Sequence, residues 1–417
     1  MLLDITQEDR QLWVSYFNLD GKTRFKTYDL QPEDMFNWEV CDGGDSKADP
    51  KIKNWDGRSV KKARSRYLNK YRIIEYMDQL SFSDRELIFG YHFPKTFFVD
   101  IEVEVTDSFP EPSKAPNPVT AICIVTPEKQ CIVLATKDLD KSVQIKIQKQ
   151  IDDHFKAIDE EFFFTFKCFK NEYDMLYTFM DSFVKKFSMM TGWNYVQFDW
   201  QYIVNRCKKL GIDPSIASPI GRTFGKHEFP CHVGVMDYLD IYAKWDRTVE
   251  IKTMEIALTI AHMTQISIFK AASPVAITEA LLAREFLTRD LVMAKDPKAP
   301  PTKRQQFEGA FVKEPKTGMH NAVAAFDFAS LYPSIMRQLN VSPESFIKKV
   351  KPEFREREVG EDRIVSVTGA VYDTKTSILK DVLSRLYGER KTYKKESFRL
   401  QQKAYDLEQE LKKQDND

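Results

Sequence analysis

Residues 325–336 read AFDFASLYPSIM and place one carboxylate, Asp327, at the end of an apolar run. The preceding letters, AVAAFDF, predict a buried strand that delivers Asp327 to its end. The letters that follow predict a turn fixed by Pro333, in which Ser330 and successive backbone N–H groups face a phosphate. The alternative is a strand followed by a proline-capped helix, with Asp327 solvated at the edge. The close succession of Asp, Ser, Tyr and Pro favours the phosphate-binding interpretation.

Length and composition limit the class of protein. The chain has 417 residues, of which 42% are hydrophobic and 13% aromatic, so we expect two to four domains with buried cores. No run of about 18 apolar residues is present to cross a bilayer, so no membrane contact is expected. The first residues, MLLDITQEDR, lack the pattern of a signal peptide, which predicts an intracellular protein. A formal net charge of zero excludes a uniformly basic nucleic-acid-binding protein.

The six cysteines and six histidines show no metal or redox pattern. No C-x-x-C pair occurs, and no histidine lies near a cysteine at zinc-ligand spacing. We therefore expect reduced thiols and assign the histidines no chemistry.

The periodicity of the apolar residues and the positions of the Gly-, Pro- and Asp-rich loops divide the chain into an α+β part and an α/β part. Residues 1–94 mix short strands with a basic helical stretch over 58–80. Strands at 96–105, 121–126 and 131–136 then precede amphipathic helices over 172–190 and within 192–211. Further helices are predicted within 251–269 and 276–287. The Pro- and Lys-rich residues 295–306 indicate a boundary, and a charged helix runs from Ile378 to the end.

A first pair of carboxylates lies in TFFVDIEVEV. Alternate residues of a strand point the same way, so Asp100 and Glu102 share one face while Val99, Ile101 and Val103 share the other. Two carboxylates on one face suit a divalent cation, and two-metal sites assist phosphodiester cleavage. The alternative is an ordinary half-exposed strand with acidic outer residues.

A further carboxylate, Asp199, follows Asn194 in TGWNYVQFDWQYIVNR. Asp199 fits the position of a helix N-cap, where a side-chain oxygen accepts backbone N–H groups. A capping role and a functional role are compatible.

These motifs resemble those of the family B DNA polymerases. DFASLYPSI is similar to motif A of that family, and QLNVSPES after it and GAFVKEP before it resemble the T-even-type phage replicative branch. FFVDIEV and GWNYVQFD resemble the first and second exonuclease motifs, and FPEPSKAPNPVTAI resembles the segment after the first. The resemblance covers nearly the whole chain and occurs in the order that the family requires.

The resemblance implies a multidomain α/β and α+β fold. Its expected parts are an N-terminal domain (1–94), a ribonuclease-H-like DEDD 3′→5′ exonuclease domain (95–250), a return to the N-terminal domain (251–307), the first part of the palm with motif A (308–377) and the first fingers helix (378–417). It also implies primer-template DNA and dNTPs as substrates, and Mg²⁺, or Mn²⁺ as a substitute, in a two-metal site.

Residue roles carry over by position in the motifs. Asp327 and the backbone carbonyl of Phe328 would bind the metal ions of the palm. Ser330, Leu331 and Tyr332 would contact the incoming triphosphate, with Tyr332 under its sugar, where a ribose 2′-hydroxyl would clash. Asp100, Glu102 and Asp199 would be the metal ligands of the exonuclease.

Two cations in the last helix fit the same interpretation. Arg390 and Lys394 are four residues apart, so they lie on one helical face, where they can neutralise a triphosphate. The family has an Arg and a Lys at this spacing. A solvated charged helix is the alternative when this stretch is taken alone.

The pattern departs from the family in two places. The sequence ends before the family's K-x-x-x-N-S-x-Y-G helix and before its D-T-D strand, which carries the second palm carboxylate. We therefore expect a split polymerase or a fragment that does not polymerise alone. A second chain would then carry these motifs B and C, contact the sliding clamp, and cover Leu383, Leu386 and Tyr387. The third exonuclease motif is also missing near Glu250, so exonuclease activity is expected to be weak or silent.

Two other functions stay open. The chain could act as a stand-alone 3′→5′ exonuclease with a palm remnant, or as a non-catalytic nucleic-acid-binding protein that uses KKARSRYLNKYR for backbone contacts and stacking. The resemblance to phage polymerases implies a location in the cytoplasm of an infected bacterial host.

Overall fold

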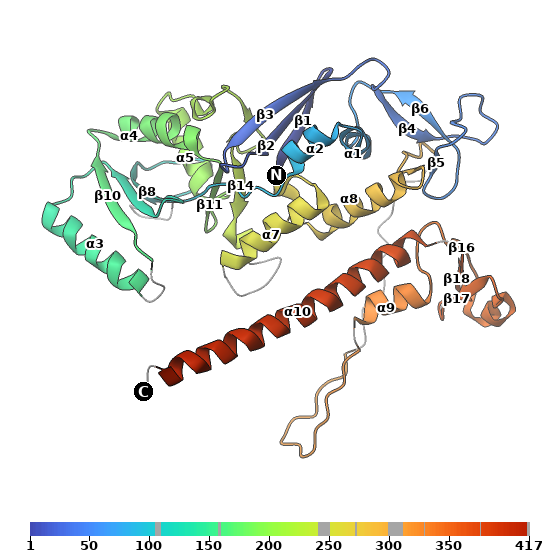
Figure 1. Ribbon diagram of the computed structural model, residues 1–417. Helices are drawn as coiled ribbons and strands as arrows, with labels where there is room; N and C mark the ends of the chain where they lie inside the picture. The colour runs from blue at the N-terminus through green and yellow to red at the C-terminus, as the bar shows by residue number, and fades with distance from the viewer. Residues whose placement is uncertain are drawn as a thin grey trace. The chain divides into compact units, whose positions relative to one another are not determined.

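The computed structural model describes residues 1–104, 110–156, 160–240, 251–271, 273–298, 312–328, 330–375 and 377–414. These residues form two compact units. The first unit holds residues 1–36 and 64–281, and the second holds residues 37–63 and 282–417. Each unit combines helices and sheets (Figure 1), so the expected multidomain architecture of α/β and α+β type is confirmed.

The first unit begins with a three-stranded antiparallel sheet. The strands are β1 (Leu2–Glu8), β2 (Gln11–Phe17) and β3 (Thr23–Asp29), in the order β1-β2-β3. Leu2, Val14 and Tyr16 are buried against α1 (Lys70–Asp78) and α2 (Phe82–Phe89). Burial of these large apolar side chains holds the two helices on the sheet.

The helix predicted over residues 58–80 is wrong in its first half. Residues 60–64 form β6 (Val60–Arg64), and α1 begins only at Lys70. Asn69 is the reason, because its side chain accepts hydrogen bonds from the backbone N–H groups of Tyr71 and Arg72 at 3.0 and 2.9 Å and so caps the helix.

A six-stranded mixed sheet follows in the first unit. Its strands are, in spatial order, β10 (Phe163–Cys168), β9 (Gln130–Ala135), β8 (Val119–Val125), β7 (Thr96–Val103), β11 (Met189–Gly192) and β14 (Gly234–Asp237). The pairs β7–β8 and β8–β9 are antiparallel, whereas β10 is parallel to β9, and β11 is parallel to both β7 and β14. The predicted strands at residues 96–105, 121–126 and 131–136 are thereby confirmed within a few residues.

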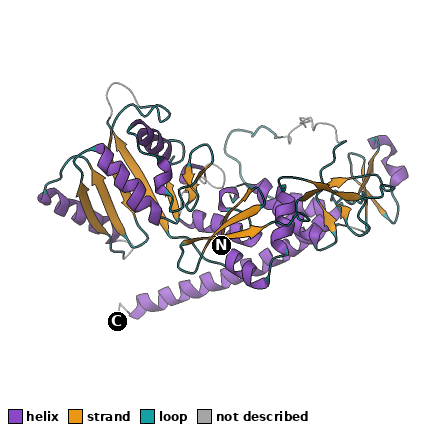
Figure 2. Cartoon of the chain, turned by 90° about the horizontal axis from the view of Figure 1, so that it is seen from above, coloured by secondary structure: helices purple, strands orange, loops and turns teal. Residues whose placement is uncertain are grey.

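Helices cover both faces of this sheet. Val99 and Ile101 of β7 face a core shared with α4 (Glu172–Thr178) and α5 (Asp199–Lys209). Phe98, the residue before Val99, faces a second core that includes residues of α7 (Ile251–Thr264). Figure 1 labels these helices, and Figure 2 shows helices lying along the strands from a second direction. Further helices join these layers: α3 (Lys141–Phe155), between β9 and β10, and α8 (Pro274–Leu287), after α7.

The single helix predicted over residues 172–190 is also wrong in its second half. Helix α4 ends at Thr178, and a π-helical turn η2 (Phe179–Phe183) and a 3₁₀ turn η3 (Val184–Lys186) follow before β11. Strand β11 is buried on both sides, because Met189 and Met190 face different cores, so its burial does not alternate. Periodicity cannot separate such a strand from a buried helix.

The second unit contains a small antiparallel sheet and the longest helix. The sheet has the order β16-β18-β17, formed by β16 (Phe346–Lys349), β18 (Ala370–Asp373) and β17 (Arg363–Val365). Two short pairs of strands precede it: β4 (Phe36–Val40) with β6, and β5 (Lys53–Asn54) with β15 (Leu291–Val292). Helix α10 (Ile378–Gln414) is confirmed from its predicted first residue and packs against α9 (Leu331–Gln338).

The QLNVSPES stretch anchors the start of α10. Glu344 accepts a hydrogen bond from the backbone N–H of Ile378 at 2.5 Å, and the hydroxyl of Ser342 accepts one from Leu379 at 3.3 Å. Ser342 also donates to Glu344 at 2.6 Å. The carboxylate satisfies N–H groups that have no partner inside the helix, and it lies at the positive end of the helix dipole.

The strand predicted for AVAAFDF is wrong. Residues 323–328 have no regular secondary structure, and the side chain of Phe326 is 95% exposed. A strand needs a hydrogen-bonded neighbour, and none of the strands in the described residues pairs with this segment. Most of the proline-rich boundary at 295–306 lies outside the described residues. No helix in the described part of the chain is both long and apolar enough to cross a membrane.

Candidate active site

Strand β7 presents two carboxylates on one face. Asp100 and Glu102 are exposed, while Val99 before them and Ile101 between them are buried. The predicted alternation is therefore confirmed. It follows from the strand geometry, because successive side chains point to opposite faces of the sheet.

Asp199 lies at the start of α5 and reaches back to β7. It is the first helical residue and not the N-cap, which is Phe198, so the predicted capping role is wrong. Its Oδ1 instead accepts a hydrogen bond from the backbone N–H of Ile101 at 3.1 Å. That N–H is available because β11 pairs with β7 only as far as Phe98. The end of the short strand β11 thus opens the position that Asp199 occupies.

Asp199 and Asp100 form a close carboxylate pair. Burial, followed by repulsion from the Asp100 carboxylate, raises the pKa of Asp199 to about 7, and its side chain is only 3% exposed. Two carboxylates in such a position cannot both ionise without cost unless a cation lies between them. Hard oxygen donors are the ligands that Mg²⁺ and Mn²⁺ prefer, so the donor set fits a divalent cation.

Glu102 is not gathered with that pair into a three-ligand cluster. Within the described ranges, no group of three or more Asp, Glu, His or Cys side chains is placed to hold a metal ion. The joint role of Asp100, Glu102 and Asp199 therefore stays a prediction. Residues 241–250, beside which the third exonuclease motif is expected to be missing, lie outside the described residues.

Two residues to which the sequence assigned no role contact the loop before α5 or Asp199 itself. Asp237, at the end of β14, accepts hydrogen bonds from the backbone N–H groups of Asn194 and Val196 at 3.0 and 2.9 Å. Tyr195 is fully buried, and burial beside Asp199 raises its pKa well above the usual value. The signal for Asp237 was an acidic residue that ends a short apolar strand. Both residues shape the loop that leads into α5.

The motif A residues lie around the start of α9. Asp327 and Phe328 precede the helix in an exposed segment. Ser330 adopts a left-handed conformation with φ +52°, α9 begins at Leu331, and the side chain of Ser330 makes no capping hydrogen bond. Tyr332 is 75% exposed. The side chain of Ser330 therefore does not cap the first N–H groups of α9. The phosphate-binding interpretation requires this, because a phosphate would accept hydrogen bonds from those groups.

Arg390 and Lys394 both lie on α10, and both are exposed. Arg337 of α9 joins the two helices, because its Nε donates to Ser384 Oγ at 3.0 Å and its guanidinium lies 5.2 Å from the ring centre of Tyr387. Arg390 is one helical turn beyond Tyr387. The three apolar residues assigned to a partner chain differ in exposure: Leu386 is 37% exposed, and Leu383 and Tyr387 are half-buried.

The basic stretch KKARSRYLNKYR is largely neutralised. Lys61 pairs with Asp45 at 2.8 Å, Arg66 with Asp9 at 3.0 Å and Lys70 with Glu279 at 2.5 Å. These carboxylates remove much of the positive charge expected there. The stretch is thus weaker support for nucleic-acid binding than its sequence suggests.

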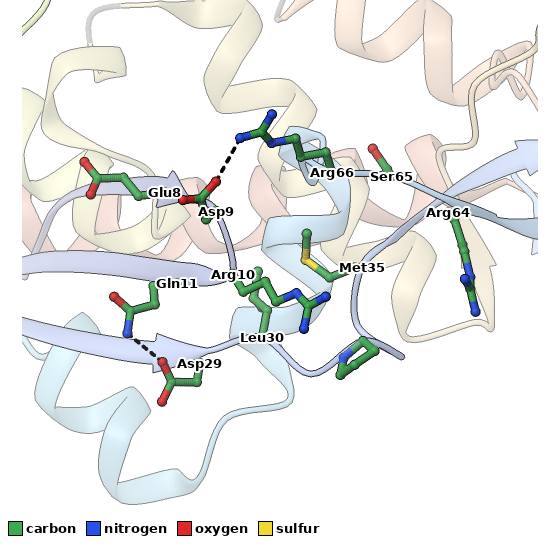
Figure 3. A pocket seen from close by; sticks show the side chains of 11 residues that line it. Glu8, Asp9, Arg10, Gln11, Asp29, Leu30, Met35, Arg64, Ser65 and Arg66 are labelled. Atoms are coloured by element: carbon green, nitrogen blue, oxygen red, sulfur yellow. Dashed lines mark hydrogen bonds and ion pairs between the residues drawn. The ribbon is translucent and has the colours of Figure 1, made fainter.

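A cavity of about 1070 Å³ lies beside the β1–β2 turn (Figure 3). Its charged lining residues balance in number: Arg10, Arg64 and Arg66 against Glu8, Asp9 and Asp29. Figure 3 shows Arg66 paired with Asp9, and Gln11 with Asp29. Because the cavity has no excess of positive charge, it does not favour a polyanion.

Comparison with known proteins identifies the class. Residues 57–237 match the family model described as "DNA polymerase family B, exonuclease domain", and residues 264–414 match "DNA polymerase family B". The chain therefore belongs to the family B DNA polymerases and carries their exonuclease domain followed by the start of the polymerase domain. The match places β7, α5 and the Asp100–Asp199 pair inside the exonuclease domain.

Individual relatives are phage polymerases at low identity. The chain is 25% identical over 322 residues to the DNA-directed DNA polymerase of Escherichia phage RB69, covering 59% of this chain and 35% of that protein. It is 23% identical over 401 residues to that of Enterobacteria phage T4, covering 75% of this chain and 43% of that protein. The chain thus spans less than half the length of these relatives.

The fold agrees with a solved polymerase structure. The family B DNA polymerase from the hyperthermophilic archaeon Pyrobaculum calidifontis superposes with a TM-score of 0.59 at 14% identity, over 96% of this chain and 64% of that one.

Proposed function

We propose that this chain is the N-terminal part of a phage replicative DNA-directed DNA polymerase. Primer-template DNA and dNTPs are its substrates, and it acts in the cytoplasm of an infected bacterial host. The observation that carries the proposal is the succession of an exonuclease domain at 57–237 and a polymerase match at 264–414 that contains the motif A residues.

In this proposal, Asp327 and the carbonyl of Phe328 bind the metal ions of the palm. Ser330 and Leu331 contact the triphosphate, and Tyr332 lies under the sugar. Arg390 and Lys394 neutralise triphosphate charge from α10. The uncapped start of α9 and the exposure of Tyr332 and Arg390 support these roles, because a ligand can reach all of them.

The residues present fit divalent cations. When bound, Mg²⁺ stabilises the charge on the attacking and leaving oxygens of phosphoryl transfer. Asp327 in the palm, and Asp100, Glu102 and Asp199 in the exonuclease domain, would hold it. The repulsion between Asp100 and Asp199 supports the second assignment, since a cation would relieve it.

A second polypeptide completes the polymerase site in this proposal. It carries motifs B and C, supplies the second palm carboxylate and contacts the sliding clamp.

Primer extension tests the polymerase proposal. The chain is co-purified from infected cells, the partner is identified by mass spectrometry, and the complex is assayed with Mg²⁺. Asp327→Asn should abolish extension, while Glu314→Gln, an exposed carboxylate upstream, should leave it unchanged. Extension that survives Asp327→Asn would refute the proposed palm site.

Nucleotide titration tests the role of α10. Arg390→Ala should raise the dNTP concentration for half-maximal extension. Arg399→Ala on the same helix, whose side chain pairs with Glu396 at 2.6 Å, is the matched control. Equal values for Arg390→Ala and the wild type would remove Arg390 from the nucleotide site.

A stand-alone 3′→5′ exonuclease is the second candidate, and the Asp100–Asp199 pair favours it. Degradation of single-stranded DNA by the chain alone, lost in Asp100→Ala, would support it. Salt-sensitive DNA binding without metal-dependent chemistry, even in the completed complex, would instead support a non-catalytic binding protein.

A further inference from the structure

The carboxylate at the end of β14 accepts three backbone N–H groups. Asp237 Oδ1 accepts from Asn194 at 3.0 Å and from Leu239 at 2.9 Å, and its Oδ2 accepts from Val196 at 2.9 Å. The residue is buried. A carboxylate has acceptors on both oxygens and no donor, so it can satisfy all three N–H groups, whereas an amide side chain cannot. The position therefore favours a carboxylate over an amide.

Two of these donors belong to the turn that leads into α5. The carbonyl oxygen of Asn194 accepts the Phe198 N–H at 2.9 Å, and that of Tyr195 accepts the Trp200 N–H at 2.8 Å. Phe198 and Trp200 flank Asp199, the first residue of α5. The first N–H groups of a helix find no partner inside it, so these carbonyls hold the helix start. The carboxylate at the end of β14 is thus linked to the position of Asp199 through the turn.

The start of α5 decides where the Asp199 carboxylate lies. Its Oδ1 accepts the Ile101 N–H at 3.1 Å, near the upper end of the range of about 2.7–3.2 Å for such bonds. A displacement of the helix start by about half an ångström would therefore break this bond. The contact between the Asp199 and Asp100 carboxylates depends on the same position.

The residue after Asp237 contacts the strand that carries the other carboxylate. The ring of Tyr238 stacks on that of Phe98 in β7, with ring centres 5.8 Å apart. Phe98 lies two residues before Asp100, so both side chains are on one face of the strand. The end of β14 therefore contacts both elements that carry the paired carboxylates: β7 through Tyr238, and the turn before α5 through Asp237.

A metal-ligand role for Asp237 itself fits the structure less well. Both of its oxygens already accept backbone N–H groups. In the part of the chain that the structure describes, it belongs to no group of three Asp, Glu, His or Cys side chains placed to hold a metal ion. A residue that orients a metal ligand without touching the metal can nevertheless change the metal affinity by about 10- to 100-fold.

We propose that Asp237 is a positioning residue: by holding residues 194–196, it keeps the carboxylate of Asp199 beside that of Asp100, where the two can share a divalent cation. This inference rests on the proposed metal-binding role of Asp100 and Asp199. It adds to the exonuclease site a third carboxylate that acts through backbone hydrogen bonds and not through the metal.

Hydrogen exchange of the full chain in EDTA tests the position of Asp199 without metal. In Asp237→Asn, one oxygen can still accept the Asn194 N–H, but the amide NH₂ replaces the acceptor of the Val196 N–H. The turn should therefore move, and the backbone N–H of Ile101, followed by mass spectrometry, should exchange about tenfold faster. Asp237→Glu keeps the carboxylate on a longer side chain. It should show a smaller change in the same direction, and it replaces Asp237→Asn if that variant does not fold.

A matched control separates positioning from general stability. Leu134→Ala opens a cavity in the core of the exonuclease sheet, on β9, two strands from β7. It should lower the melting temperature at least as much as Asp237→Asn does. The Ile101 N–H should nevertheless exchange at the wild-type rate in this control, because the turn before α5 is intact.

Electron paramagnetic resonance of free Mn²⁺ measures the effect on the metal site. All variants carry Asp327→Asn, so that an ion at the proposed palm site does not contribute. Asp237→Asn should raise the Kd of Mn²⁺ about tenfold. Asp199→Asn should abolish this binding, and Leu134→Ala should leave it unchanged.

The outcomes separate this inference from the proposed function. Wild-type Ile101 exchange together with wild-type Mn²⁺ affinity in Asp237→Asn would overturn the inference. Equal losses in Leu134→Ala would also overturn it, because the role would then be one of general stability. Mn²⁺ binding that survives Asp199→Asn would instead refute the proposed metal site and the shared cation. The exchange of the Ile101 N–H would still decide whether Asp237 positions Asp199.

Discussion

The carboxylate of Asp199 makes the stability of the exonuclease domain depend on pH in an unusual direction. Its pKa is raised from 3.8 to about 7 in the folded chain by burial and by the neighbouring Asp100. Between these two values the folded state keeps a proton that the unfolded state has released. The free energy of unfolding therefore falls as the pH rises through this window. Above the window, the folded state bears the full free-energy cost of ionising Asp199.

The size of the effect follows from the shift. About three pKa units at 1.36 kcal/mol each give a loss of about 4 kcal/mol between pH 4 and pH 8. Asp199→Asn cannot ionise but keeps an oxygen that accepts the Ile101 N–H, so it should escape this loss. At pH 8 without metal, this variant should melt roughly 10 °C above the wild type, since a unit of this size shifts by about 2–4 °C per kcal/mol.

Differential scanning calorimetry of the full chain in EDTA, from pH 4 to pH 8, measures this difference. Asp153→Asn, an exposed carboxylate on α3, controls for the change in net charge. Parallel pH profiles for the wild type and Asp199→Asn would refute the reasoning. Added Mg²⁺ at pH 8 should stabilise the wild type and not Asp199→Asn. Absence of that effect would remove the metal site but leave the pH effect, which depends on burial.

Three further substitutions test packing and caps, each by thermal unfolding of the full chain. Arg206→Met should cost about 3 kcal/mol, because Arg206 makes two hydrogen bonds of 2.8 Å to a largely buried Glu172 that would be left unpaired. The double variant with Glu172→Met should recover much of that loss; a cost equal to the sum of the single costs would contradict the pairing. Glu344→Ala should cost about 1–2 kcal/mol, since it removes the acceptor for the Ile378 N–H, and an unchanged melting point would show that α10 needs no such cap. Gly192→Ala should cost about 1–3 kcal/mol, because the new Cβ would lie 2.6 Å from a carbonyl oxygen of β7, and wild-type stability would mean that the strands can separate there.

Local sequence patterns predicted the structure correctly where the backbone geometry alone determines it. The alternation in β7 placed Asp100 and Glu102 on one face, and the structure agrees, because the period of a strand is fixed by its backbone. The start of α10 at Ile378 was likewise predicted. The order of the motifs indicated the family B polymerases, and the family matches confirm that class.

Local patterns failed where a neighbour decides the structure. AVAAFDF has the composition of a buried strand, but in the described residues no strand pairs with it, so it stays irregular and exposed. The strand β11 was read as helix because a strand buried on both faces has no alternation. Asp199 was read as a cap because its partner, the Ile101 N–H, is 98 residues away along the chain.

The sequence by itself determined the class of protein, the face of β7 that carries carboxylates and the residues that resemble motif A. These features depend on residue order and on backbone periodicity, which are local. Only the tertiary structure decided that Asp199 joins Asp100 and that Asp237 holds the loop before α5. Burial and charge repulsion act through space, so they depend on contacts that no stretch of sequence contains.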